Sequence, residues 1–264
     1  MEGTDLYVPQ PWQGTGLTDT GLVRTSNQDA FALENPLGLW VIADGMGGHA
    51  GGSLASQLAV QSTITYMRKS SNLLSTGTIE SSAATNLLLH AIATSHTAIR
   101  EKALVHPEFE GMGTTIVIAV YCAGPPMQIA FAHVGDSRAY LIRNGTIRLL
   151  TSDHSLVQRL LTEGQITPDE ALNHPQQNIL LRALGADDQS KPDIHLQDLE
   201  PEDMFLLCTD GLTKTATEKE ILSTIIADRM TPSKACQSLI ELANAHGGKD
   251  NTTVVLISPS PNGR

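Results

Sequence analysis

The residues most able to do chemistry lie between Leu39 and Gly52, where an apolar run ends on an aspartate. Leu39 to Ala43 has the short, continuous hydrophobic pattern of a buried strand. Asp44 follows, and five of the next eight residues are glycine. Glycine lets the main chain come close to a bound group, so Asp44 and nearby carbonyl oxygens could hold one ligand together. A helix is expected from Ser53 to Lys69, where apolar residues recur every three or four positions.

The same loop also fits a second kind of site. Gly45 to Ala50 matches the G-x-G-x-x-A pattern of a dinucleotide-binding loop between a strand and a helix. Against this interpretation, Asp44 would lie where the pyrophosphate charge must go. The acidic residue that should follow about twenty positions later falls inside the expected helix. A P-loop is excluded because no Gly-Lys-Ser/Thr follows. A nucleotide-binding oxidoreductase therefore stays open as an alternative to a metal site.

Three more aspartates stand beside or near a glycine at strand ends: Asp136, Asp210 and Asp250. Asp136 and Asp210 each follow an apolar strand, whereas Asp250 precedes the last one. Carboxylates packed together without partners repel one another and take up protons. Divalent cations remove that cost, and an all-oxygen ligand set favours Mg²⁺ or Mn²⁺ over Zn²⁺. Together with Asp44, these residues predict a site where sheet edges converge on hard metal ions.

The remaining pattern indicates an α+β fold. Four strands between Thr114 and Leu150 are expected to form one antiparallel meander, with Asn144-Gly145 as a type I′ hairpin turn. From 151 to 190 the pattern changes to short helices, with a capping box at Thr167 to Glu170. This stretch interrupts a strand-rich region, so we expect an excursion at one edge rather than a separate domain.

Length and composition suit a single large domain or two small ones. A net charge of −11 argues against nucleic acid, since nothing supplies a basic face to neutralise phosphates. The longest unbroken apolar run, Ile116 to Ala123, is far too short to span a bilayer. Cys122, Cys208 and Cys236 are widely separated and show no disulfide or zinc spacing. With no signal peptide, they favour a reducing cytoplasm.

Several motifs, in order along the chain, resemble those of the type 2C, metal-dependent (PPM) protein phosphatases of the compact bacterial kind. They are Gly21-Leu22-Val23-Arg24, Asn27-Gln28-Asp29-Ala30, Ala43 to His49, Gly113-Thr114-Thr115, His133 to Arg138, Ser152 to Ser155, Asp210-Gly211-Leu212 and Gly248 to Asn251. The resemblance covers about 13–258. It implies two packed antiparallel sheets flanked by helices, a four-layer αββα sandwich, with 151–190 as the flap. The phosphatase domain would span 12–258, between a flexible N-terminal tail (1–11) and a C-terminal tail (259–264).

The resemblance also implies which residues hold metal ions. Asp44 would bridge two ions, with the Gly45 carbonyl on one of them. Asp210 and Asp250 would complete the ligand set of the other ion. Asp136, together with Asp210, would hold a third and weaker ion. The implied cofactors are therefore Mn²⁺ or Mg²⁺, with two central ions and a probable third site.

The implied reaction is hydrolysis of phosphoserine and phosphothreonine by in-line attack of a hydroxide that bridges the two ions. Asp29 would act on metal-bound waters, Arg24 would grip the substrate phosphate with two N–H groups, and His49 would be the candidate general acid. The implied partners are phosphoproteins made by serine/threonine kinases, with no membrane or nucleic acid, and the chain is expected to be a monomer.

The sequence departs from the family pattern at a few positions, of which Thr209 (commonly Ser) and Lys249 (commonly Arg) look tolerable. Gln28 stands where many eukaryotic relatives have Glu, and Gln177 in the flap stands where relatives often have Arg. The departure at Gln177 bears on substrate preference. The chain could serve one dedicated regulatory partner, or it could be a pseudo-phosphatase that only binds phosphoproteins. The complete set of metal-ligand positions argues against the second alternative.

Overall fold

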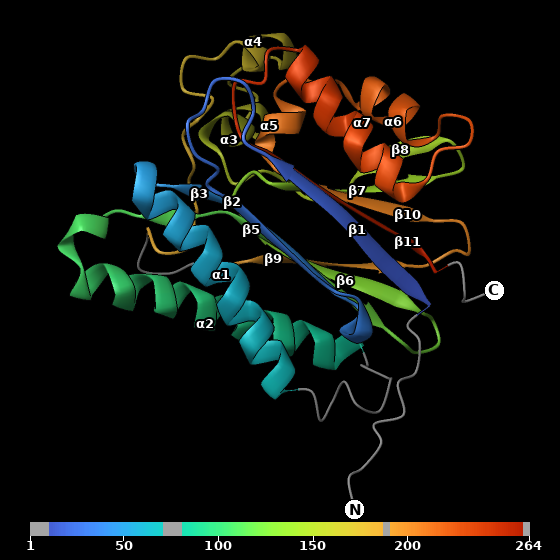
Figure 1. Cartoon of the computed structure of the whole chain (residues 1–264), viewed down its shortest axis with the longest axis horizontal. Coiled ribbons are helices and arrows are strands. Elements are labelled where there is room, and N and C mark those ends of the chain that lie inside the picture. Colours follow the sequence, from blue (N-terminus) through green and yellow to red (C-terminus); the bar gives the residue numbers. More distant parts are fainter. Residues whose placement is uncertain (1–10, 71–80, 187–190, 261–264) are drawn as a thin grey trace, which may run out of the picture.

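The computed structural model describes residues 11–70, 81–186 and 191–260 (Figure 1). One sheet consists of five antiparallel strands in the order β1 (Trp12–Asp19), β11 (Thr252–Pro259), β10 (Met204–Cys208), β7 (Arg138–Arg143) and β8 (Thr146–Leu149). The other has the order β2 (Asp29–Glu34), β3 (Leu39–Met46), β5 (Ile116–Cys122), β6 (Gln128–Val134) and β9 (Asp193–Asp198). The two-residue strand β4 (Gly113–Thr114) pairs with the end of β3.

Helices cover the outer faces of both sheets (Figure 1). The β3 sheet carries α1 (His49–Lys69) and α2 (Ser81–Val105), and the β10 sheet carries α5 (Asp210–Thr213), α6 (Glu218–Ile225) and α7 (Pro232–Ala245). Two short helices, α3 (Leu156–Thr162) and α4 (Pro168–Leu172), belong to the flap, and single 3₁₀ turns lie at Asn35–Leu37 and Pro107–Phe109. The expected four-layer αββα sandwich is confirmed.

The core has three layers because both faces of the central strands are covered. In β3, Val41 packs into the cluster beneath α1 and α2, while Trp40 and Ile42 point the other way, into the cluster between the sheets. A third cluster lies beneath α6 and α7 and includes Leu206 and Leu239. A strand buried on both faces needs no polar alternation, which is why Leu39 to Ala43 is continuously apolar.

The expected four-stranded meander is wrong. β5 and β6 form a hairpin in one sheet, whereas β7 and β8 form a hairpin in the other. The chain crosses between the sheets at Gly135–Ser137, and Gly135 has a φ of 105°. A Cβ on Gly135 would come within 2.6 Å of Thr115, so the crossover needs glycine for both conformation and space. The type I′ turn is confirmed, with φ of 51° at Asn144 and 70° at Gly145.

α1 begins at His49 rather than at the expected Ser53. Gly48 caps it with a φ of 79°, and the Gly52 amide donates to the Gly48 carbonyl at 3.2 Å. A Cβ on Gly52 would lie 2.9 Å from the Gly45 main chain. The glycines that weaken helix propensity thus let the first helical turn pack directly against the end of β3.

The flap is anchored at its base. Ser155 pairs with Leu180, and Leu184 pairs with Thr114, in isolated antiparallel bridges. The Thr167 capping box is present as predicted. Residues 187–190 of the expected flap, and most of the two expected tails (1–11 and 259–264), lie outside the described residues.

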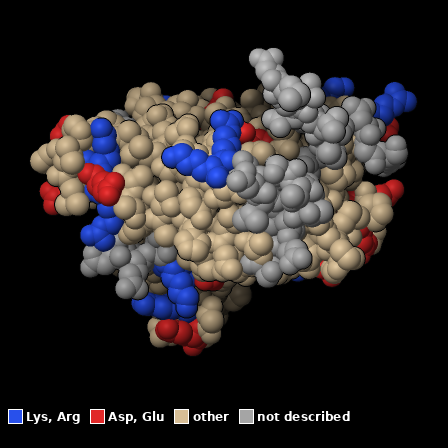
Figure 2. Space-filling model, turned by 90° about the horizontal axis from the view of Figure 1, so that it is seen from below, with Lys and Arg blue, Asp and Glu red and all other residues tan. Residues whose placement is uncertain are grey.

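Within the described residues, no helix has the length and apolarity needed to cross a bilayer. On the face shown in Figure 2, Lys and Arg side chains lie in separate groups with Asp and Glu among them, over a largely uncharged surface. This mixture differs from the continuous basic face that binds nucleic acid.

Candidate metal centre and active site

The register between neighbouring strands places the first two aspartates of the site. β2 and β3 pair so that Asp29 lies directly opposite Asp44. The main chain of Asp44 is fixed from the other side by β4 and β5, because its carbonyl accepts from the Thr115 amide at 2.8 Å and from the Thr114 hydroxyl at 2.8 Å. Its amide donates to Thr115 Oγ1 at 3.0 Å. Asp44 is therefore held within β3, between β2 on one side and Thr114 and Thr115 on the other, rather than at a free strand end.

Asp29 is held from the opposite sheet. Its Oδ2 accepts from the hydroxyls of Thr209, at 2.9 Å, and Thr253, at 2.7 Å. Burial raises the pKa of Asp29 to about 7, although the two hydroxyls lower it. The sequence analysis missed both threonines. Each lies beside a predicted aspartate motif, but only the packing of the two sheets brings them to Asp29.

The remaining aspartates converge on Asp44. Burial raises its pKa well above the usual value, and so does the negative charge of Asp29, Asp210, Asp136 and Asp250. Burial and the charge of Asp210 likewise raise the pKa of Asp136 to about 7. Five carboxylates thus share one electrostatic environment. We call Asp29, Asp44, Asp136, Asp210 and Asp250 the aspartate cluster.

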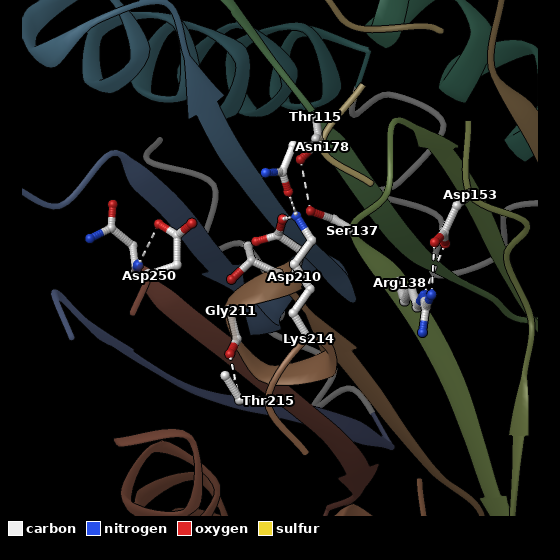
Figure 3. Close-up of polar contacts among 12 residues, drawn as sticks. Thr115, Ser137, Arg138, Asp153, Asn178, Asp210, Gly211, Lys214, Thr215 and Asp250 are labelled. Carbon is white, nitrogen blue, oxygen red and sulfur yellow. Dashed lines mark hydrogen bonds and ion pairs between the residues drawn. The ribbon is translucent and has the colours of Figure 1, made fainter. Parts of the chain in front are cut away.

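Asp136 and Asp210 come from two connections that end strands. Asp136 lies in the crossover between the sheets, where Ser137 and Thr115 share a hydrogen bond of 2.7 Å (Figure 3). Asp210 opens α5, a single turn whose C-cap is Lys214. The Lys214 ammonium contacts Asp210 Oδ2 and donates to Asn178 Oδ1 of the flap at 2.8 Å (Figure 3). Neither Lys214 nor Asn178 was singled out from the sequence.

Asp250 lies at the entry to β11, as predicted. Its Oδ2 accepts from Arg24 at 2.8 Å, and half of the Arg24 side chain is exposed (51%). The side chain of the neighbouring Asn251 organises the Arg24 loop. Its Nδ2 donates to the main-chain carbonyls of Thr20 and Ser26, and its Oδ1 accepts from the main-chain amide of Gln28. Asn251 belongs to a quoted motif, but its structural role was not predicted.

These residues line a pocket of about 380 Å³. Of the predicted site residues, Arg24, Asp44, Gly45, Asp136, Asp210 and Asp250 line it. Asp29 lies behind Asp44 and is only 8% exposed. His49 opens α1 beside the pocket residue Gly48, but its side chain lies outside what the structure describes.

The chemistry of this donor set fits divalent cations. Asp29 Oδ1 and Asp210 Oδ1 are buried and have no hydrogen-bond partner among the described residues. Arg24 and Lys214 are the cationic side chains in the described lining of the pocket. They cannot balance five carboxylates, and all the donors are oxygen, which suits Mg²⁺ or Mn²⁺.

The dinucleotide alternative does not fit this topology. The strands paired with β3, namely β2, β4 and β5, all run antiparallel to it. The loop from Gly45 to Ala50 therefore does not begin a parallel strand–helix–strand unit, which a dinucleotide-binding site requires.

A second cluster of ionisable side chains lies at the base of the flap. His133 and His154 stack with ring centroids 4.6 Å apart, and Asp193 completes a set whose ligand atoms lie within 4.8 Å of one another. His154 Nδ1 accepts from the Gly135 amide at 3.2 Å, and His154 Nε2 lies 3.1 Å from Arg182 Nη1 and 3.3 Å from Asp193 Oδ2. Arg182 donates to the same carboxylate at 2.9 Å. We call His133, His154, Arg182 and Asp193 the flap-base network.

Comparisons with known proteins agree with the site. The family model described as "Protein phosphatase 2C" matches residues 22–245. The serine/threonine phosphatase stp of Listeria welshimeri is 38% identical over 243 residues, which cover 91% of this chain and 93% of that protein. The structure of serine/threonine phosphatase Stp1 from Staphylococcus aureus matches with a TM-score of 0.84 and 34% identity, over 98% of this chain and 100% of the other. The catalytic domain of serine/threonine protein phosphatase PstP, solved with two manganese ions, matches with a TM-score of 0.79 and 31% identity, over 94% and 97%.

Proposed function

This chain belongs to the protein phosphatase 2C family and is a metal-dependent serine/threonine phosphatase, and we propose the parts that its residues play in the reaction. The observation that carries the proposal is the aspartate cluster beside a pocket, in which two buried carboxylate oxygens have no hydrogen-bond partner among the described residues. A surface for binding phosphoproteins alone would not need five converging carboxylates. The pseudo-phosphatase alternative is therefore disfavoured.

Asp44, Asp210, Asp250 and the Gly45 carbonyl would hold two divalent cations. When bound, such ions lower the pKa of water and neutralise charge on the phosphoryl group. Asp44 is suited to the shared position because it lies opposite Asp29 in the ladder and feels the charge of every other member of the cluster. Its main chain is fixed by Thr114 and Thr115, so it needs little reorganisation on binding.

Asp29 would take and hold a proton at Oδ1. The Thr209 and Thr253 hydroxyls occupy Oδ2, which leaves Oδ1 as the unpartnered buried oxygen. Bound divalent cations would lower the raised pKa of Asp29, so that its Oδ1 could accept a proton as a general base.

Arg24 would bind the substrate phosphate. It uses one N–H group on Asp250, so other N–H groups of the planar fork can reach phosphate oxygens at the pocket rim. Asp250 would then orient Arg24 as well as bind metal. His49 would protonate the leaving alkoxide, which its position at the start of α1, beside the pocket residue Gly48, supports.

The wider assignment follows from the same site. The substrates would be phosphoproteins made by serine/threonine kinases, in-line attack by water would need no protein nucleophile, and one domain spanning about 12–258 would act as a monomer. All three cysteines are free and buried, which supports a location in the reducing cytoplasm.

The test is hydrolysis of a phosphothreonine peptide with Mn²⁺, with Mg²⁺ and with a chelator, alongside the matching phosphotyrosine peptide. We expect turnover of the phosphothreonine peptide with either metal and none with the chelator. Activity that persists in chelator, or a preference for phosphotyrosine, would contradict the proposal.

A further inference from the structure

Lys214 places a positive charge inside the aspartate cluster. It ends the single turn of α5, four residues after Asp210, which brings its ammonium back onto the carboxylate of that residue. Figure 3 shows the side chain extending from α5 between Asp210 and Asn178. The ammonium takes two oxygen acceptors, Asp210 Oδ2 and Asn178 Oδ1, which are the kind of ligands that a hard cation uses.

The ammonium also lies between two hollows. Lys214, Asp210 and Asp136 line both the catalytic pocket and a groove of about 290 Å³ beneath the flap helices. Lys214 therefore stands in the wall that separates the two hollows. Lys214 and Asp136 attract one another electrostatically, as Lys214 and Asp210 do. Lys214 also attracts Asp44, so the two carboxylates expected to hold a third metal ion are among those whose negative charge it offsets.

This arrangement differs from an ordinary surface ion pair. The Asp210 side chain is only 12% exposed and that of Lys214 is 34% exposed, whereas exposed helical pairs keep both groups in water. The ammonium occupies Asp210 Oδ2, and Asp210 Oδ1, which has no partner among the described residues, is left for one of the two central ions. A divalent cation shared by Asp210 Oδ2 and Asp136 is disfavoured, because its charge and the ammonium would lie within a few ångströms of each other beside a carboxylate that is only 12% exposed.

We propose that the Lys214 ammonium takes the place of the third divalent ion, so that this enzyme binds two metal ions and carries its third cation covalently. The inference rests on the proposed function, since it presumes the two central ions. It assigns Lys214 as a positioning residue that keeps Asp136 and Asp210 in place when no third ion is bound.

The experiment counts Mn²⁺ ions per chain by equilibrium dialysis and calorimetry, on substrate-free protein at neutral pH. Wild type is expected to bind about two ions. Lys214→Met, which removes the charge and keeps the length, is expected to bind about three, the third most weakly. Lys214→Arg retains the charge and should bind about two. Lys219→Met is the matched control, because it removes an exposed lysine on α6 and should also leave about two.

A double variant locates the added ion. Lys214→Met combined with Asp136→Asn is expected to return to about two ions, because the third site loses a carboxylate. Near-ultraviolet circular dichroism checks folding, and Lys214→Gln carries the same expectation if the methionine variant does not fold. Three ions in wild type, or an unchanged count in both neutral variants, would overturn the inference. Wild type that binds no ion at all would instead contradict the proposed function.

Discussion

The aspartate cluster and the flap-base network are both dense groups of titratable side chains, and they differ in how their charges are balanced. In the network, the described contacts give His154 Nδ1 an amide donor and pair Asp193 with Arg182. In the cluster, Asp29 Oδ1 and Asp210 Oδ1 stay unpartnered among the described residues. Distances alone would allow a metal ion at the network. Unbalanced charge is the better indicator of where a metal ion is required.

The largest effect on activity is expected when Asp44, at the centre of the aspartate cluster, is replaced. Asp44→Ala is expected to lower kcat/KM by roughly 10³-fold or more at any Mn²⁺ concentration, because it would delete the ligand that we propose both ions share. The fold should survive, since the loss of repulsion offsets the loss of metal binding. Steady-state kinetics and metal counting check this. Asp193→Asn is the matched control from the network and should leave the metal count unchanged. Substantial activity in Asp44→Ala would remove the two-ion assignment.

The second prediction concerns the rim of the cluster. Arg24→Ala is expected to raise KM for a phosphopeptide by about 10- to 100-fold, the size of a lost charge-assisted hydrogen bond. If the contact tightens in the transition state, kcat falls as well. Arg24→Lys should recover only part, because an ammonium lacks the two-pronged geometry. The number of bound metal ions should not change. Equal KM and kcat in all three proteins would leave phosphate binding to the metal ions alone.

The third prediction uses pH and metal removal together. The pKa values of Asp29 and Asp136 are raised to about 7, so the folded metal-free chain binds more protons than the unfolded chain above pH 4. Its stability therefore falls as pH rises toward 7. Mn²⁺ binds the deprotonated form, so saturating Mn²⁺ should raise Tm by about 5–10 °C at pH 8 and by little at pH 5. Thermal melts with and without chelator measure this, and an equal gain at both pH values would contradict it.

The smallest effect is expected in the network, and it has the opposite sign. Burial, first, and the neighbouring His133 lower the pKa of His154 to about 4. The unfolded chain takes up this proton near pH 6.5, so the folded state loses stability as pH falls from there toward 4. His154→Gln should reduce that loss by roughly 1 kcal/mol, less than the full pKa shift would give, because Arg182 and Asp193 beside the ring are partly exposed and solvent screens them. Urea unfolding of chelated wild type and variant at both ends of this range gives the difference. The same pH slope in both proteins would mean that His154 is not the group that titrates.

Much of the fold follows from local pattern. The apolar run before Asp44 and the capping box at Thr167 each depend on a few neighbouring residues, so the sequence alone predicts them. The Asn144-Gly145 turn is equally local, because its left-handed backbone depends on these two residues. The family motifs then identify the aspartates expected to bind metal ions, because each motif includes the aspartate at the end of one strand.

Tertiary structure decided what local pattern cannot express. Strand periodicity assigns each residue to a face but does not say which sheet a strand joins, so the crossover at Gly135 was taken for part of a meander. The hydroxyls of Thr209 and Thr253 reach Asp29 only because the two sheets pack face to face. Lys214 shares a helical turn with Asp210, but its contact with Asn178, 36 positions away, exists only in the folded chain. Residue type and spacing thus determine which groups can do the chemistry, whereas packing decides which of them share a charge environment.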